Sequence, residues 1–150
     1  MKKNALISLL LLAGISMGCA TDSPEGPVEP GYRPALQSTE AGLWMTMDKF
    51  ERRLANSELV ERDPELNRYV RGVLCRVSPS HCEDVRVFII KNPYFNATMA
   101  PNGSMHVWSG LLLRVQNEDQ LAAVLAHEMA HYLHRHSSNS GIQQKQRWSF

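Results

Sequence analysis

The stretch that decides the fold is Asn117–His136, with the sequence NEDQLAAVLAHEMAHYLHRH. It predicts a helix because Asn117 is a good N-cap, acidic residues follow in the first turn, and apolar residues recur at helical spacing. The many alanines and the apolar coverage lead us to expect a helix buried in a core. Within it stands the string HEMAH, which contains His127, Glu128 and His131.

The HEMAH string is typical of a zinc hydrolase site. Residues four apart share one face of a helix, so the imidazoles of His127 and His131 can bind one ion. Glu128 then lies beside the metal, where it can accept the proton of a metal-activated water. The alternative interpretation is a chance match in a structural helix.

A third zinc ligand is missing from the sequence. A catalytic zinc ion takes three protein ligands, yet no Asp or Glu follows Glu128. His134 is a helical neighbour of His131, but three histidines on one helix would have difficulty surrounding an ion tetrahedrally, and His136 is expected to point away. We therefore expect the third ligand beyond residue 150, in a longer protein of which this chain is a fragment. A degenerate protein is the alternative.

The N-terminal region predicts export. Residues 1–18 have two lysines before an apolar run that is too short to span a bilayer comfortably, as in a secretory signal. A small residue precedes Cys19, which resembles the lipobox of bacterial lipoproteins and implies that Cys19 carries a lipid. An ordinary cleaved signal with a free Cys19 is the alternative. Residues 19–37 are rich in Pro and Gly and are expected to form a flexible tether, which leaves 38–150 as the domain.

The other two cysteines also point to an oxidising compartment. Cys75 and Cys82 are separated by six residues, and we expect a local disulfide between them. A metal site that includes His81 is the weaker alternative, because the cysteine spacing is too long for a zinc knuckle. Without residues 1–18 the chain has 14 basic and 15 acidic residues. This balance, without a basic stripe, gives no indication of a nucleic-acid partner.

The remaining pattern predicts an α+β domain that is mainly helical. One helix is expected around Leu43–Leu54, and a second begins at the N-cap Asp63 and runs to Cys75. Two strands are expected at Val85–Ile90 and Met105–Trp108, with a Pro-Asn-Gly turn before the second. We expect the two strands to form a hairpin-like unit that packs on the HExxH helix.

The run from Val85 to His136 resembles the zinc metallopeptidases of the CAAX prenyl endopeptidase and HtpX-like group. The resemblance lies in several features that occur in the same order: Asn96-Ala97, Pro101 and Gly103, the strand Met105–Trp108, Gly110-Leu111-Leu112, the capped helix start at Asn117, HEMAH and Arg135-His136.

The resemblance implies a zincin-like fold of the gluzincin type, incomplete at the C-terminus, with Zn²⁺ as cofactor. His127 and His131 would bind the zinc, Glu128 would be the general base, and a glutamate from a later helix would complete the site. An edge strand would pair with an extended polypeptide substrate. That strand consists of Met105, His106, Val107 and Trp108. An ordinary edge strand is the alternative for these four residues.

The expected function is that of a zinc endopeptidase of the bacterial cell envelope that acts on unfolded or misassembled proteins. The lipid on Cys19 would hold it at the periplasmic face of a membrane. The outer membrane is favoured because Ala20 replaces the aspartate that retains many lipoproteins in the inner membrane. Two alternatives are a chaperone-like or binding lipoprotein that keeps the fold without a complete metal site, and a purely structural lipoprotein.

Overall fold

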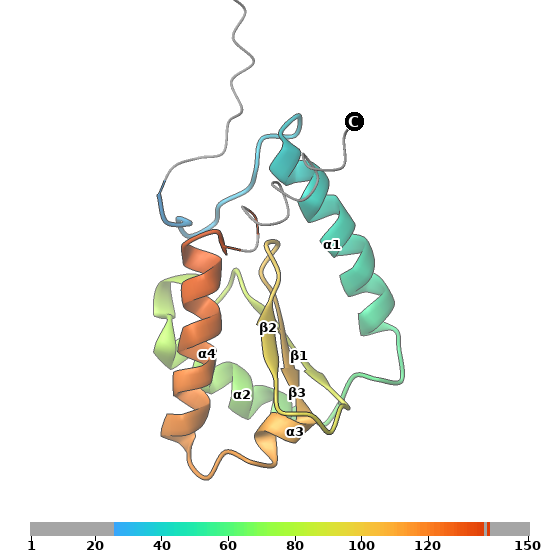
Figure 1. Cartoon of the computed structure of the whole chain (residues 1–150), viewed down its shortest axis with the longest axis vertical. Coiled ribbons are helices and arrows are strands. Elements are labelled where there is room, and N and C mark those ends of the chain that lie inside the picture. Colours follow the sequence, from blue (N-terminus) through green and yellow to red (C-terminus); the bar gives the residue numbers. More distant parts are fainter. Residues whose placement is uncertain (1–25, 137, 139–150) are drawn as a thin grey trace, which may run out of the picture.

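The computed structural model describes residues 26–136 and residue 138. Helices surround a small three-stranded sheet, so the domain is of the expected α+β class (Figure 1). The elements of this part are α1 (Thr39–Ala55), α2 (Pro64–Val77), η1 (Pro79–His81), β1 (Arg86–Ile90), β2 (Ala97–Met99), β3 (Ser104–Trp108), α3 (Ser109–Leu112) and α4 (Glu118–Leu133). The expected signal 1–18 and Cys19 lie outside the described residues. No helix in the described part is both long and apolar enough to cross a membrane.

Side-chain caps set where the long helices begin. Asp63 accepts a hydrogen bond from the Leu66 N–H at 2.7 Å, and Asn117 accepts one from the Gln120 N–H at 2.9 Å. Both caps are confirmed, as is Pro64 in the first position of α2, where its missing N–H costs nothing. The motif helix therefore begins where the sequence predicts.

The strand pairing differs from the predicted hairpin. The sheet order is β1-β3-β2, with β1 parallel to β3 and β2 antiparallel to β3. The two predicted strands exist, but the prediction that they form a hairpin with each other is wrong. The hairpin is β2–β3, and β2 has only three residues, which is too short to show an alternating pattern.

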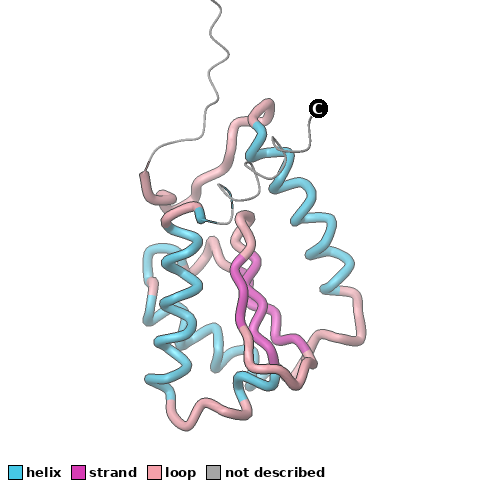
Figure 2. Tube along the Cα trace, in the orientation of Figure 1, coloured by secondary structure: helices cyan, strands magenta, loops and turns pink. Residues whose placement is uncertain are grey.

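The core lies between the sheet and two helices. In Figure 2, α4 and α2 lie on one side of the strands and α1 on the other. The buried core residues of α2 form one cluster with side chains of β1, β3 and α4. The side chains from these three elements are Ile89, Met105, Val107, Leu121, Leu125 and Met129. Burial of this apolar surface fixes α4 against β2 and α2.

The second half of the predicted tether packs against the core. Val28 is 5% exposed and belongs to the core, and its N–H donates to the Leu133 carbonyl at 2.9 Å. The Val28 carbonyl in turn lies 2.9 Å from Nε2 of His81. The prediction that 19–37 is a flexible tether is therefore wrong for its second half. Pro and Gly do not prevent a segment from docking when a single valine fills a gap in the core.

Gly110 lies where only a glycine fits. A Cβ atom at this position would overlap the Pro93 carbonyl oxygen and lie 2.5 Å from the Tyr94 carbonyl oxygen. We expect Gly110→Ala to reduce the free energy of unfolding by about 1–3 kcal/mol, as overpacking does. Urea unfolding followed by circular dichroism measures this.

Gly72→Ala is the matched control, because a Cβ atom at Gly72 would meet only the Arg76 side chain at 3.6 Å. In the interior of α2 this change should stabilise by about 0.5–1 kcal/mol. Equal effects of the two alanines would contradict the described packing at Gly110.

Candidate metal centre

Helix α4 presents the HExxH motif on its accessible side. Only one stripe of the helix is buried, formed by Leu121, Leu125, Met129 and Tyr132. His127 is exposed, whereas Glu128 and His131 are half-buried. The expectation that the whole helix lies inside the core is wrong, because alanines that favour a helix do not require burial. In the described part of the chain, His127 is therefore accessible to solvent.

The two motif histidines converge on one point. Nε2 of His127 lies 3.1 Å from Nε2 of His131, with the ring planes 89° apart. Zinc–nitrogen bonds of about 2.0–2.1 Å place two ligands of a tetrahedral ion about 3.3–3.4 Å apart. The donor set and its spacing therefore fit zinc with a shift of a few tenths of an ångström.

Glu128 lies beside these histidines in an environment suited to a base. Burial raises the pKa of the Glu128 carboxyl above its ordinary value, and the nearby His131 and His127 partly offset that rise. A general base works best when its pKa approaches the working pH, so this direction favours proton transfer.

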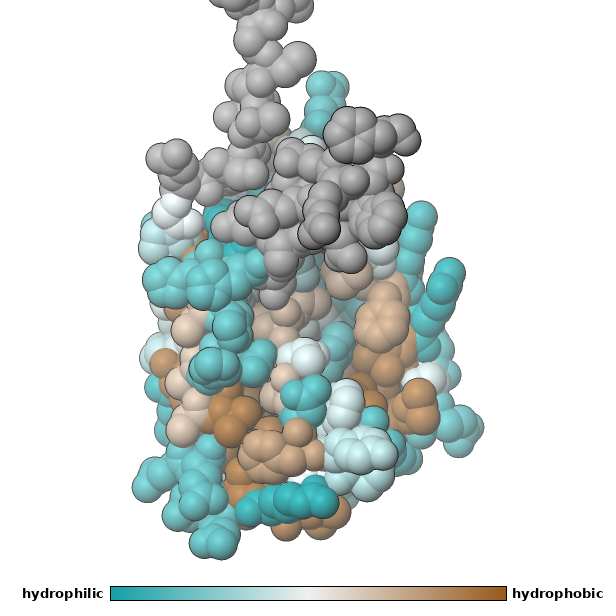
Figure 3. Space-filling view, in the orientation of Figure 1, coloured by the Kyte–Doolittle hydropathy of each residue, from teal (hydrophilic) through white to brown (hydrophobic). Residues whose placement is uncertain are grey.

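An apolar cavity of about 350 Å³ adjoins the motif. His127 and Glu128 form part of its wall, and the rest comes from α4, α3, the first residue of β2 and the loop before it: Phe95, Asn96, Ala97, Leu111, Ala123 and Val124. In Figure 3 hydrophobic residues gather between α4 and α3 on the visible face. A cavity of this size and lining can hold an apolar side chain next to the metal ligands.

The histidines after the motif do not lie where a continuous helix would put them. The helix ends at Leu133 with His134 as its C-cap, and Nδ1 of His136 lies 2.9 Å from Nδ1 of His131. The expectation that His136 points away is wrong, because the chain turns back at this end of α4. His136 contacts the ring nitrogen of His131 that does not face His127, so in this arrangement Nδ1 of His136 does not converge on the same point as the two Nε2 atoms.

Within residues 26–136 and 138, no group of three or more His, Cys, Asp or Glu side chains is arranged to hold a metal ion. The candidate zinc ligands in the described part of the chain are therefore the two histidines His127 and His131.

The predicted substrate strand is not an edge strand. Met105, His106 and Val107 pair with β1 on one side and with β2 on the other, and Trp108 pairs with Ile90. Their main-chain groups are used by the sheet, so the prediction that Met105–Trp108 receives a substrate as an edge is wrong. In the described residues β2 has a strand neighbour on one side only.

The predicted disulfide is confirmed. Cys75 in α2 is bonded to Cys82 after η1, with their Cα atoms 4.8 Å apart. It joins the end of α2 to the segment that leads into β1. His81 is buried and contacts the Val28 carbonyl, so it takes no part in a metal site with these cysteines.

Two features near the site carry no clear signal in the sequence. Arg135 enters the prediction only through the family resemblance, yet it forms a buried ion pair with Glu40 of α1. The residues Phe95, Ala123 and Val124 line the cavity but look like ordinary core residues. Helical spacing could have placed Ala123 and Val124 beside His127, since they precede it by one turn.

A helix that aims two imidazole Nε2 atoms at one point, with a glutamate next to the first and an apolar cavity alongside, defines a metallopeptidase-type site. The chain belongs to peptidase family M48, whose sequence profile matches residues 60–148. The family assignment confirms the metallopeptidase part of the resemblance drawn from Val85–His136.

Similar proteins occur in bacteria and in mitochondria. The chain is 30% identical over 142 residues to the beta-barrel assembly-enhancing protease of Escherichia coli, covering 91% of this chain and 29% of that protein. It is 42% identical over 73 residues to the mitochondrial metalloendopeptidase OMA1 of Schizosaccharomyces pombe, covering 47% of this chain and 22% of that protein. The chain is also 33% identical over 113 residues to the mitochondrial metalloendopeptidase OMA1 of Homo sapiens, covering 69% of this chain and 20% of that protein. The chain spans less than a third of the length of these relatives.

Proposed function

We propose that the protein is a zinc-dependent endopeptidase of the bacterial cell envelope that hydrolyses peptide bonds of unfolded or misassembled proteins. The observation that carries the proposal is the convergence of the His127 and His131 Nε2 atoms at 3.1 Å, with Glu128 and an apolar cavity beside them. The third zinc ligand, in this proposal, is a glutamate beyond residue 150. The order of motifs from Val85 to His136 supports a place close to the CAAX prenyl endopeptidase and HtpX-like group.

Each motif residue has a defined task in peptide hydrolysis. When bound, zinc lowers the pKa of water and polarises a carbonyl oxygen. His127 and His131 would hold the ion through their Nε2 atoms, whose spacing is set by their positions four residues apart on α4. Glu128 accepts the proton of the attacking water and delivers it to the nitrogen of the leaving amine. The raised pKa of Glu128 favours the first half of this transfer, in which the carboxylate accepts the proton.

The outer edge of β2 is the proposed substrate strand. The Trp108 N–H donates to the Asn96 carbonyl and the Ala100 N–H to the Ser104 carbonyl. In an antiparallel ladder of this register, the peptide groups of Ala97 point away from β3. An extended peptide could therefore pair at Ala97, a mode that tolerates many sequences. Because Ala97 also lines the cavity, one apolar substrate side chain would enter it near Glu128.

The envelope location is supported by three features of the chain. Residues 1–18 resemble a secretory signal, Cys19 has the context of a lipidated cysteine, and the Cys75–Cys82 disulfide is typical of an oxidising compartment. The name of the Escherichia coli relative ties that protein to beta-barrel assembly. We extend this to the present chain and propose envelope polypeptides as substrates, with a lipid anchor in the outer membrane.

A chaperone-like lipoprotein without catalysis is the second candidate. It is favoured by one observation, that the described residues supply only two of the three ligands that a catalytic zinc site requires. Such a protein would bind unfolded chains through the cavity and the β2 edge without cutting them.

Metal removal separates the two candidates. The full-length protein is incubated with an unfolded polypeptide such as reduced casein, with and without 1,10-phenanthroline. The endopeptidase predicts cleavage that the chelator abolishes and added zinc restores. The chaperone predicts suppressed aggregation without cleavage, unaffected by the chelator.

A further inference from the structure

The chain reverses direction immediately after α4. Arg135 has a φ of 55°, in the left-handed region that residues other than glycine rarely adopt. The reversal carries His136 back along the helix, where its Nδ1 atom lies 2.9 Å from Nδ1 of His131. A motif histidine therefore has a hydrogen-bonding partner from the turn that follows its own helix.

This contact settles which nitrogen of His131 must carry the proton in a metal site. Nε2 of His131 faces Nε2 of His127, so it has to keep its lone pair for a metal. A neutral His131 then carries its proton on Nδ1 and donates it to the Nδ1 lone pair of His136. Partners of this kind orient a metal-binding histidine and raise its basicity.

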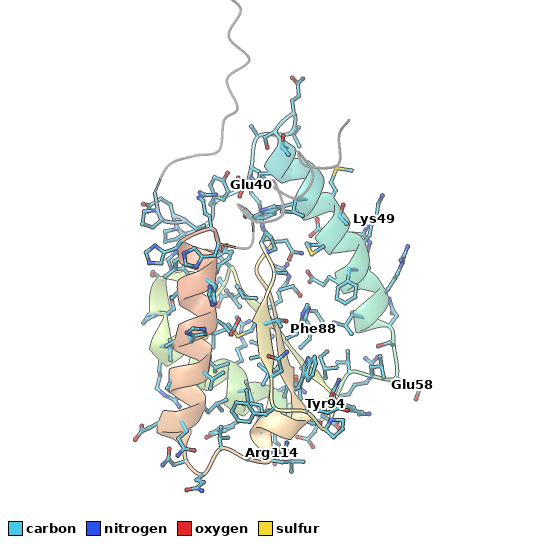
Figure 4. All side chains as sticks on the ribbon, in the orientation of Figure 1. Glu40, Lys49, Glu58, Phe88, Tyr94 and Arg114 are labelled. Atoms are coloured by element: carbon cyan, nitrogen blue, oxygen red, sulfur yellow. A yellow bond between two sulfur atoms is a disulfide. The ribbon has the colours of Figure 1, made fainter. Side chains whose placement is uncertain are left out.

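The side chain of Arg135 contacts Glu40, which is buried, and Tyr32, which is half-buried. We name these three residues the Arg135 anchor and infer that their contacts hold the unusual backbone conformation of Arg135. Nη1 of Arg135 lies 2.9 Å from Oε1 of Glu40, with the two side chains 6% and 4% exposed. The Tyr32 hydroxyl donates to Oε2 of Glu40 at 2.7 Å, and the guanidinium lies 4.1 Å from the centre of the Tyr32 ring. Figure 4 shows Glu40 at the start of α1, beside the end of α4.

The anchor also ties the turn to the segment before α1. Nε of Arg135 donates to the Gly26 carbonyl at 3.3 Å, two residues before the core residue Val28. The turn is thus fixed by elements about a hundred residues earlier in the chain, since Gly26 and Glu40 precede Arg135 by 109 and 95 residues. Nothing in HEMAH itself requires these contacts.

We propose that His136 is a positioning residue for the zinc ligand His131, and that the Arg135 anchor holds the turn that places it. The inference rests on the proposed zinc site and adds how that site is oriented. Zinc affinity at α4 then depends on α1 and on the segment before it, which never touch the metal.

The test measures zinc affinity of the full-length protein by competition with a chromogenic chelator. His136→Ala is expected to weaken zinc binding by about 10–100-fold, the range for loss of such a partner. His136→Asn keeps an acceptor oxygen near the position of Nδ1 and should restore most of the affinity. His134→Ala is the control, because the His134 ring stacks on that of His136 at 5.7 Å without replacing its contact to His131.

A second readout follows the proton on His131. ¹⁵N NMR of the zinc-free protein should show His131 protonated on Nδ1, and His136→Ala should shift it towards a mixture of the two neutral forms. A residue that merely stabilised the fold would not change this equilibrium.

Arg135→Gly tests the anchor separately. Glycine adopts a positive φ without strain, so the turn remains possible while the contact with Glu40 is lost. Zinc affinity should fall in the same direction as in His136→Ala. The variant that carries both Arg135→Gly and His136→Ala should bind zinc no more weakly than the weaker-binding single variant. Both changes act through the same hydrogen bond between His136 and His131.

The outcomes distinguish this inference from the proposed function. Wild-type protein that binds no zinc would overturn both. Zinc binding by the wild type, with equal affinity in His136→Ala, would overturn the inference alone. If His136→Ala does not fold, equal affinities of His136→Asn and His136→Leu would overturn it instead.

Discussion

Glu128→Gln is expected to lower the rate of peptide hydrolysis by about 10²–10⁴-fold, the contribution of a positioned general base. The glutamine side chain has nearly the same shape but cannot accept the proton of the attacking water. Zinc should remain bound, because in the proposed site His127 and His131 hold the ion through Nε2 and Glu128 does not bind it. The measurement is kcat/KM on a quenched fluorescent peptide, together with the zinc content of the same sample.

Glu118→Gln is the matched control for this change. Glu118 lies in the first turn of the same helix, where it pairs with Arg76 at 2.6 Å away from the motif. Its removal should leave kcat/KM unchanged. Wild-type hydrolysis by Glu128→Gln would contradict the role given to Glu128, and so would loss of zinc from that variant.

Glu40→Ala is expected to reduce the free energy of unfolding by about 3–5 kcal/mol, because it leaves the buried guanidinium of Arg135 without its carboxylate. The pair is nearly enclosed, with side chains 6% and 4% exposed. The Tyr32 hydroxyl would lose its acceptor as well. Urea unfolding in the presence of a chelator measures the effect without any contribution from bound metal.

The exposed pair Arg71–Glu83 provides the comparison. Its side chains are 42% and 89% exposed at an N–O distance of 3.0 Å, so Glu83→Ala should cost about 0–1 kcal/mol. A loss at Glu40 as small as that at Glu83 would contradict the structural weight given to the Arg135 anchor.

Features with a local cause could be predicted from the sequence. The caps Asp63 and Asn117, the strand before Asn92 and the Cys75–Cys82 disulfide depend on neighbouring residues and are found as expected. The convergence of His127 and His131 also follows from spacing on one helix.

Features that depend on contacts between distant parts of the chain could not be predicted from the sequence. β1 is parallel to β3 because β2 lies between them in the sequence and forms the hairpin with β3. β2 has only three residues, too few to show the alternating pattern that would predict a strand. The docking of Val28 depends on a gap between Leu133 and His81 that no local pattern shows. The position of His136 depends on the end of α4, where Arg135 has a positive φ, and helical spacing does not predict this change of backbone direction.

The central claim is that His127 and His131 form a zinc site, and zinc stoichiometry tests it most directly. The full-length protein, purified without added metal chelators, is analysed by inductively coupled plasma mass spectrometry beside His127→Ala and the control His106→Ala. The account predicts one zinc per chain in the wild type and in the control, and loss of zinc in His127→Ala. A wild type without zinc, or undiminished zinc in His127→Ala, would contradict it.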